Sequence, residues 1–246
     1  MIRSLMSLVL ALGVSSSAWA MDKAYFDIKK VTVTDVTEQQ PELTAGQRTG
    51  LLDDCSAQAP QQGILISRTG DPAVVGLNPL DQLQVWVDQI INIGKKIWAI
   101  VEAGKPVVNI KLDTANALPK GVRCWTDMQG WAMPQSKVYR VQYENAYGMT
   151  VVDFSYRLMF TANGNVDGVG KYITNATFQP ANLSVGWGFR FDATAAIPAV
   201  FNQGTKQDPV AGMQMNMAWR VDSPLAHEES TESYFVTGDN KLVKMK

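Results

Sequence analysis

The single histidine of the chain, His227, is the residue best suited to move protons in a reaction. An imidazole has an ordinary pKa of about 6.5 and can therefore act as a base or an acid near neutral pH. A Ser-His-Asp site would have to recruit residues far away in the sequence, because neither GxSxG nor another local nucleophile signature is present. We therefore assign no catalytic residue and interpret His227, in the stretch LAHEES between a strand end and an acidic stretch, as a surface-loop histidine.

The segment ANGNVDG places oxygen-bearing side chains at alternating positions, as a calcium-binding loop does. These residues are Asn163, Asn165 and Asp167. An EF-hand loop needs a bidentate glutamate at its twelfth position, where this chain has Thr174. Asn-Gly and Asp-Gly are also the residues that hairpin turns require. A turn is therefore the favoured interpretation, and a weak calcium-type site is the alternative.

Aromatic residues are concentrated just after Cys124, in CWTDMQGWAMP and the residues that follow. Their rings offer large apolar area together with a polar handle, which suits a site for a sugar, an apolar ligand or a protein partner. Aromatic residues beside a buried cysteine also commonly belong to the core. The sequence leaves open a core role or a ligand or partner surface for Trp125, Trp131, Tyr139, Tyr143 and Tyr147.

Thioether ligands for copper are offered by three alternating methionines, Met213, Met215 and Met217. The same spacing places them on one face of a strand, where methionines pack in a core, and no histidine or cysteine lies nearby. The stretches GVGK and GWG lack the spacing of a phosphate-binding loop. We therefore favour core packing for the methionines and expect no cofactor.

The N-terminal stretch MIRSLMSLVLALGVSSSAWA predicts the compartment. It has a basic residue, a short apolar run and an A-x-A cleavage site that ends at Ala20. We expect residues 1–20 to be a signal peptide, so that the mature protein is periplasmic or secreted. In an oxidising compartment Cys55 and Cys124 would form a disulfide that stabilises the fold by about 4 kcal/mol. Two buried free thiols are the alternative.

The charge composition argues against some classes of binding partner. The chain has 22 basic and 23 acidic residues without long runs of one charge, which argues against nucleic-acid binding and against a polybasic membrane patch. With 46% hydrophobic residues the chain has enough apolar material for a folded core. The expected organisation is a single domain over residues 21–246.

The elements that must position these residues include an unusually apolar segment, NPLDQLQVWVDQIINIGKKIWAIVEAGKP. Asn78 is a good N-cap, Pro79 suits the first helical position, and Gly104 with Pro106 forms a stop signal. These features predict one long amphipathic helix over 78–105. Its apolar stripe has a 4-3-4-3-4 spacing through Leu83, Val87, Ile90, Gly94, Ile97 and Val101.

Covering the apolar face of a sheet is the favoured role of this helix, and contact with a partner or a membrane surface is the alternative. We do not expect the helix to cross a bilayer, because Asp88, Asn92, Lys95 and Lys96 would lie near its middle.

A period of two predicts the strands in the rest of the chain. We expect antiparallel strands over 107–112, 139–143, 152–160, 183–191, 213–221 and 231–236, and further strands in the stretches 24–36 and 63–68. The region 21–77 is expected to combine strand and loop, and 107–246 to form the antiparallel β region, with a hairpin turn at 145–148. The expected fold class is α+β: a mostly antiparallel β-sheet, open to a sandwich-like arrangement, with the long amphipathic helix packed on its apolar face.

The function expected from these features is that of an exported non-enzymatic binding, assembly or envelope-interaction protein. Its partner would be another envelope or secreted protein, or a small apolar or sugar ligand, but not nucleic acid; membrane contact is not favoured. One alternative is a membrane-active or secreted host-interaction protein that uses the helix over 79–103. A second alternative is an exported hydrolase with an unrecognised site.

Overall fold

The computed structural model describes residues 22–39, 64–67, 83–104 and 113–245. Strands make up 67% of these residues and helices only 6%, so the expected α+β class is wrong and the described fold is almost entirely β. The helical elements are single turns: α1 (Lys23–Phe26), η1 (Thr37–Gln39) and η3 (Trp125–Asp127). No helix within the described ranges has both the length and the apolar composition needed to span a membrane.

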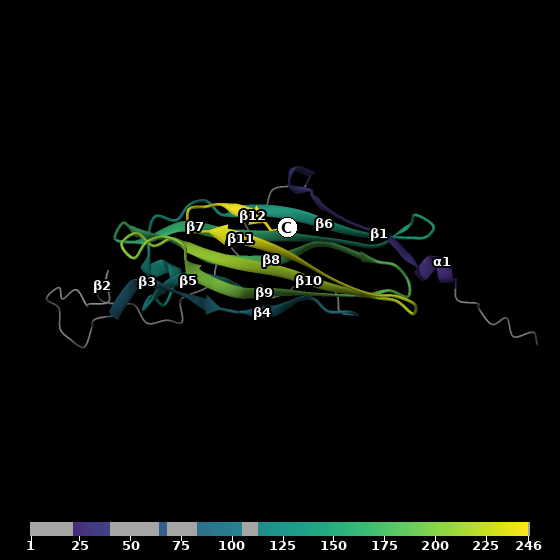
Figure 1. Ribbon diagram of the computed structural model, residues 1–246, viewed down its shortest axis with the longest axis horizontal. Coiled ribbons are helices and arrows are strands. Elements are labelled where there is room, and N and C mark those ends of the chain that lie inside the picture. Colours follow the sequence, from purple (N-terminus) through teal and green to yellow (C-terminus); the bar gives the residue numbers. More distant parts are fainter. Residues whose placement is uncertain (1–21, 40–63, 68–82, 105–112, 246) are drawn as a thin grey trace, which may run out of the picture.

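Two sheets pack face to face in a sandwich that is elongated along its strands (Figure 1). The seven-stranded sheet has the order β1 (Ile28–Asp35), β6 (Gln135–Asn145), β7 (Thr150–Val166), β8 (Val169–Val185), β5 (Ala115–Lys120), β3 (Leu83–Gly94) and β2 (Ile64–Ser67). The five-stranded sheet has the order β12 (Leu242–Lys244), β11 (His227–Thr237), β10 (Ala211–Asp222), β9 (Arg190–Asn202) and β4 (Ile97–Val101). All paired neighbours run antiparallel except β2 and β3, which run parallel.

The described part of the segment expected to be a long helix, residues 83–104, instead contains two strands in different sheets. β3 pairs with β5 in the seven-stranded sheet, and β4 pairs with β9 in the five-stranded sheet. Gly94, Lys95 and Lys96 form the link, in which Gly94 has a φ of +121°. β-Branched and aromatic residues dominate the segment and favour strands over helices, and Gly94 interrupts any helical reading. The apolar stripe followed a helical spacing only because most positions of the segment are apolar.

The link between the sheets is fixed by backbone hydrogen bonds on both sides. Lys95 N–H donates to Thr114 O at 3.0 Å, and the Ile197 N–H donates to Lys96 O at 2.7 Å. A Cβ on Gly94 would lie 2.4 Å from Thr114 O, so the close approach of the two backbones requires glycine at this position.

Several other strand predictions agree with the structure. The runs expected over 139–143, 152–160, 213–221 and 231–236 lie within strands, and a hairpin turn joins β6 to β7. Residues 28–35 of the stretch 24–36 form β1, but its first residues belong to α1; of the run 63–68, the described residues 64–67 form β2. The strand expected over 183–191 is wrong, because a turn at residues 186–189 divides it between β8 and β9. The run 107–112 and the expected signal peptide 1–20 lie outside the described residues.

The interior between the sheets is rich in aromatic residues and methionine. Met213, Met215 and Met217 on β10 are fully buried, which confirms that their alternation reflects core packing. Tyr156 and Tyr234 face each other across the sandwich with their hydroxyl oxygens 2.7 Å apart. Pairing of these hydroxyls satisfies polar groups that burial would otherwise leave without a partner.

A buried asparagine joins three strands where the pairing of β5 with β8 is irregular. The Asn116 side chain on β5 donates to Ile93 O of β3 at 2.7 Å. Its Oδ1 accepts hydrogen bonds from the Thr174 hydroxyl at 2.8 Å and from the Asn175 N–H at 2.9 Å, both on β8. One amide side chain therefore replaces the ladder hydrogen bonds that the irregular register omits.

The expected disulfide is not confirmed. Cys55 lies outside the described residues, and no disulfide joins two cysteines within the described ranges. Cys124, which precedes η3, is buried with 4% of its surface exposed and is not a free thiol.

Candidate binding site

One end of the sandwich, which we call the loop end, carries α1 and three turns. These turns join β6 to β7 (146–149), β8 to β9 (186–189) and β10 to β11 (223–226). The strand register places them together, because Ile28 pairs with Asn145, Val152 with Val185, and Arg190 with Asp222. In Figure 1 this end lies on the right.

Large apolar side chains are exposed on the turns of the loop end. Trp187 is 82% exposed, Tyr147 58%, Met149 53%, Leu225 51% and Val185 36%. Single exposed apolar residues are ordinary on a protein surface, but several on adjacent turns indicate an interaction site.

The Trp187 ring lies against a cluster of packed aromatic rings. It lies 6.1 Å from that of Phe26, which in turn lies 5.5 Å from Phe189 and 5.0 Å from Tyr25 between ring centroids. Gly188 next to it has a φ of +79°, and a Cβ there would lie 2.7 Å from the Phe26 ring. The exposed tryptophan is therefore held on a turn that is fixed by its neighbours.

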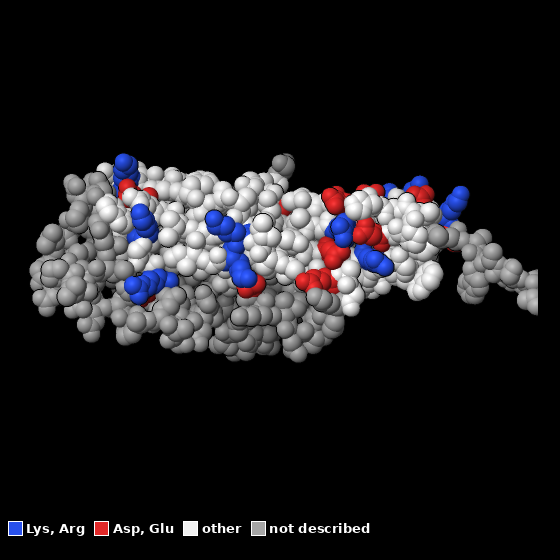
Figure 2. Space-filling view, turned by 90° about the horizontal axis from the view of Figure 1, so that it is seen from below, with Lys and Arg blue, Asp and Glu red and all other residues white. Residues whose placement is uncertain are grey.

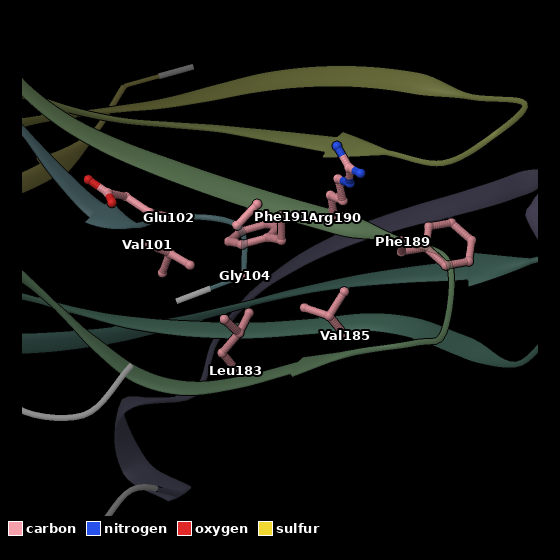
Figure 3. A pocket seen from close by; sticks show the side chains of 9 residues that line it. Val101, Glu102, Gly104, Leu183, Val185, Phe189, Arg190 and Phe191 are labelled. Atoms are coloured by element: carbon pink, nitrogen blue, oxygen red, sulfur yellow. The ribbon is translucent and has the colours of Figure 1, made fainter. Parts of the chain in front are cut away.

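A pocket of about 510 Å³ opens beside this turn (Figure 3). It lies where β8 runs on beyond the end of β5, so that within the described residues β8 is paired there on its β7 side only. The lining residues come from the end of β4, the end of β8 and the start of β9: Val101, Glu102, Ala103, Gly104, Leu183, Val185, Phe189, Arg190 and Phe191. In Figure 3 Leu183 and Val185 of β8 face Val101 and Phe191 from the opposite sheet, which makes the walls mainly apolar.

Two charged residues form part of the pocket rim. Figure 3 shows the Glu102 carboxylate and the Arg190 guanidinium directed away from Leu183 and Val185. The Ala103 N–H, also at the rim, donates to Asp192 Oδ1 at 2.8 Å and so ties the end of β4 to β9. The site is thus a half-open pocket to which both apolar and polar groups contribute.

Six charged or titratable residues form a ladder across β9, β10 and β11 next to the pocket. In one row across the strands, Arg190 lies opposite Asp222 and Asp222 lies opposite His227. In the next row, Asp192 lies opposite Arg220 and Arg220 lies opposite Glu229. Charges of opposite sign thus alternate along and across the strands. The ladder belongs to the loop end, toward which acidic and basic side chains gather in Figure 2.

Within this ladder Asp222 has two partners. Its Oδ1 lies 2.5 Å from His227 Nδ1, and its Oδ2 lies 2.9 Å from Arg220 Nε. Arg220 also reaches Asp192 at 3.3 Å. Because these pairs are solvent-exposed, they contribute more to the orientation of the side chains than to stability.

No match is found when the chain is compared with protein-family models, with curated proteins or with solved structures. The function must therefore be argued from the site itself.

His227 is held between two carboxylates. In addition to Asp222 at Nδ1, Glu229 Oε1 lies 3.3 Å from its Nε2. The hydrogen bond to Asp222 is the main cause that raises the pKa of His227 above its ordinary value, and the Asp222 and Glu229 charges add to it. Among the described residues no hydroxyl or thiol hydrogen-bonds to either ring nitrogen, so the arrangement does not resemble a nucleophile with its base.

We expect the His227 pair with Asp222 to make stability depend on pH. Because the folded-state pKa is raised, the stabilisation is fully present below the unfolded-state pKa of about 6.5 and is lost as the pH rises through the folded-state pKa. An NMR titration should give a His227 midpoint above about 6.5, and Asp222→Asn should lower it. Glu228→Gln is the matched control, and an Asp222→Asn variant with an unchanged midpoint would contradict the assignment.

The five aromatic residues proposed from the sequence do not form one surface. Tyr139 and Tyr143 are buried in the core, where Tyr143 accepts a hydrogen bond from Trp219 Nε1 at 2.8 Å. Trp125 and Trp131 are partly buried, and the Trp131 Nε1 donates to Trp125 O at 3.1 Å. Only Tyr147 lies at the loop end, where its hydroxyl donates to the Asp22 carboxylate at 2.9 Å.

The calcium-type residues lie at the opposite end of the sandwich, in and beside the turn from β7 to β8. Asn165 Oδ1 accepts the Gly168 N–H at 2.8 Å, and Asn163 and Asp167 have positive φ values of 67° and 48°. Side-chain oxygen is thus used to form the turn. Among the described residues no group of three or more His, Cys, Asp or Glu side chains is arranged to hold a metal ion.

Sequence analysis did not identify Trp187 as an exposed turn residue. It also did not identify Asp222 and Arg190, which lie in the same row of the ladder as His227. The glycines on either side of Trp187 could have indicated a turn, since GWG interrupts an otherwise regular alternation. The charged residues of β9 and β10 were recognised as the polar face of strands. Their pairing could not be recognised, because it depends on the register between strands.

Proposed function

We propose that the protein is an exported, non-enzymatic binding protein that holds an apolar ligand at its loop end. The observation that carries this proposal is the pocket lined by Leu183, Val185 and Phe191, next to the turn on which Trp187 is 82% exposed. An exposed indole on a fixed turn beside an apolar cavity suits binding by burial of apolar surface.

The alternatives have less support. The membrane-active alternative used a helix over 79–103, but Val85, Val87, Trp98 and Ile100 of this segment are buried in strands. A hydrolase would depend on His227, whose two nitrogens face carboxylates. A sugar or a protein partner at the exposed turns remains compatible with the same end of the molecule, but the apolar pocket walls favour a small apolar ligand.

The neutral dye N-phenyl-1-naphthylamine provides a direct test, because its fluorescence rises in apolar surroundings. We expect saturable binding at a single site of the full mature chain. Val185→Asp places a charge in the pocket wall and should weaken binding by at least about tenfold, since an unpaired charge in an apolar site costs more than 1.4 kcal/mol. Val185 is 36% exposed, so the fold should tolerate the change.

Met133→Asp is the matched control, because Met133 is apolar, 74% exposed and outside the loop end. This variant should bind the dye like the unaltered protein. Absence of saturable binding, or equal affinities for the Val185→Asp and Met133→Asp variants, would contradict the proposed function.

A further inference from the structure

We infer that the protein forms a dimer in which the outer face of the five-stranded sheet lies against the same face of a second copy. The charged ladder lies on this outer face, because Phe191, Trp219 and Val221, which alternate with its members on β9 and β10, are buried in the core between the sheets. The contact uses a different surface from the pocket and does not depend on the proposed function.

The two rows of the ladder carry opposite sequences of charge. With the histidine protonated, the row nearer the loop end is positive, negative and positive through Arg190, Asp222 and His227. The next row is negative, positive and negative, and its members are Asp192, Arg220 and Glu229. Such a surface repels a copy that places each row over the same row and attracts a copy that places each row over the other.

A two-fold axis can produce the attractive arrangement. In a symmetric dimer both copies contribute the same patch, so every contact between two different residues occurs twice. When the axis runs across the strands, between the two rows, Asp222 of one copy lies over Arg220 of the other, and every other member of the ladder also lies over an opposite charge. When the axis runs along β10, Asp222 lies over Asp222 and like charges meet. The ladder therefore selects the arrangement in which the strands of the two copies run in opposite directions.

The surfaces that flank the ladder also fit each other in this arrangement. The turn 223–226, which carries the 51% exposed Leu225, comes over the row that follows the ladder in the other copy. The members of that row all have small side chains and are Thr231, Ala218, Thr194 and Ala99. In the row beyond, Ile97 is 67% exposed. A projecting turn with a large apolar residue thus meets a flat surface of small residues, so the charged rows can approach each other.

The contact is large enough for a weak dimer. Four strands about 4.8 Å apart that overlap over about 34 Å give about 650 Å² per copy, a little below the value of about 800 Å² for a standard interface. The charges at its centre also have partners within each copy, as Asp222 Oδ2 does at 2.9 Å from Arg220 Nε. Because exposed charge pairs are individually weak and are screened by salt, we expect a Kd of about 10–100 µM in low salt.

Sedimentation velocity of the full mature chain measures this equilibrium, at about pH 6 where His227 is protonated. The Kd should rise at least about tenfold between about 50 and 500 mM NaCl, because salt screens the charges at the contact. A chain that stays monomeric at about 500 µM in low salt, or a dimer whose Kd does not respond to salt, would overturn the inference.

Charge-swap variants test which face is used. Arg220→Asp would place two acidic groups together and Asp222→Arg two basic groups, so each variant alone should raise the Kd at least about tenfold. An equimolar mixture of the two variants should form a mixed dimer with a Kd within about threefold of the unaltered value, because both contacts then join opposite charges. Lys206→Asp is the matched control, since Lys206 is exposed in the turn from β9 to β10 at the opposite end, and it should leave the Kd unchanged.

Mixing cannot repair a purely structural effect of either substitution, so the mixed dimer is the decisive outcome. A variant that self-associates with the unaltered Kd, or a mixture that binds no more tightly than its components, would overturn this arrangement. His227→Glu and Glu229→Lys form a second complementary pair at two exposed positions of the ladder. This pair gives the same two outcomes where circular dichroism shows that a variant of the first pair is unfolded.

Discussion

Gly94→Ala is expected to lower the free energy of unfolding by about 2–3 kcal/mol. Gly94 links β3 to β4 with a φ of +121°, a conformation that costs other residues about 1–2 kcal/mol. The new Cβ would also meet Thr114 O at 2.4 Å, so the backbone of β3 or of the residues that lead into β5 would have to move. Urea denaturation of the full mature chain measures the change.

Gly148→Ala separates the two contributions. Gly148 has a φ of +74°, but nothing lies within 4 Å of a Cβ placed there, so its substitution should cost about 1 kcal/mol from the backbone conformation alone. The sign of the Gly94 result also distinguishes strands from a helix. In the interior of a helix, alanine would stabilise the protein by about 1 kcal/mol relative to glycine, and such a gain would contradict the crossing between sheets.

Asn116→Leu should be more damaging, with a loss of about 3–5 kcal/mol. The substitution leaves the Thr174 hydroxyl, the Asn175 N–H and the Ile93 carbonyl without the partner that Asn116 gives them. Each buried polar group left unsatisfied costs about 1–3 kcal/mol, and part of this is offset when water or neighbouring groups rearrange. Thermal and urea denaturation both measure the loss.

Asn182→Leu is the matched control for this prediction, since Asn182 lies on β8 but is exposed. It should change the free energy of unfolding by less than about 0.5 kcal/mol. Thr174→Val removes one of the three groups and should give an intermediate loss of about 1–2 kcal/mol. Equal stabilities for the Asn116 and Asn182 variants would show that the buried amide does not join the three strands.

The strands that sequence analysis predicted correctly have one face in the core and one facing water. On β10 the buried residues Met213, Met215 and Met217 alternate with more exposed polar ones, and the same pattern holds on β6. In β3 and β4 the apolar residues are too dense for the period to be read. There the β-branched residues Val85, Val87 and Ile90 were better indicators of a strand than the spacing was of a helix.

The candidate site could be predicted only in part, because it depends on which strands become neighbours. Trp187 was assigned to a strand interior, although Gly186 and Gly188 beside it allow a turn. His227 was predicted to lie in a surface loop; it is exposed, but it is the first residue of strand β11. Its two carboxylate partners follow from the hairpin of β10 and β11, and the pocket follows from the unequal lengths of β5 and β8. Neither of these features has a local signature in the sequence.

The two short links between the sheets also restrict how the sandwich can move. The chain passes from β3 to β4 near the middle of β9, where Ile97 pairs with Ala196, and from β8 to β9 at the loop end, so the sheets cannot slide along each other without straining a link. On the opposite side, β1 and β12 lie at the outer edges, and the described layers are joined there by side chains such as Tyr139 with Tyr234 and by the hydrogen bond from Asn163 N–H to Gly238 O. Thermal fluctuations should therefore separate the two sheets first along the β1–β12 margin and disturb the pocket least, because the pocket lies on the opposite side, beside the β8–β9 turn.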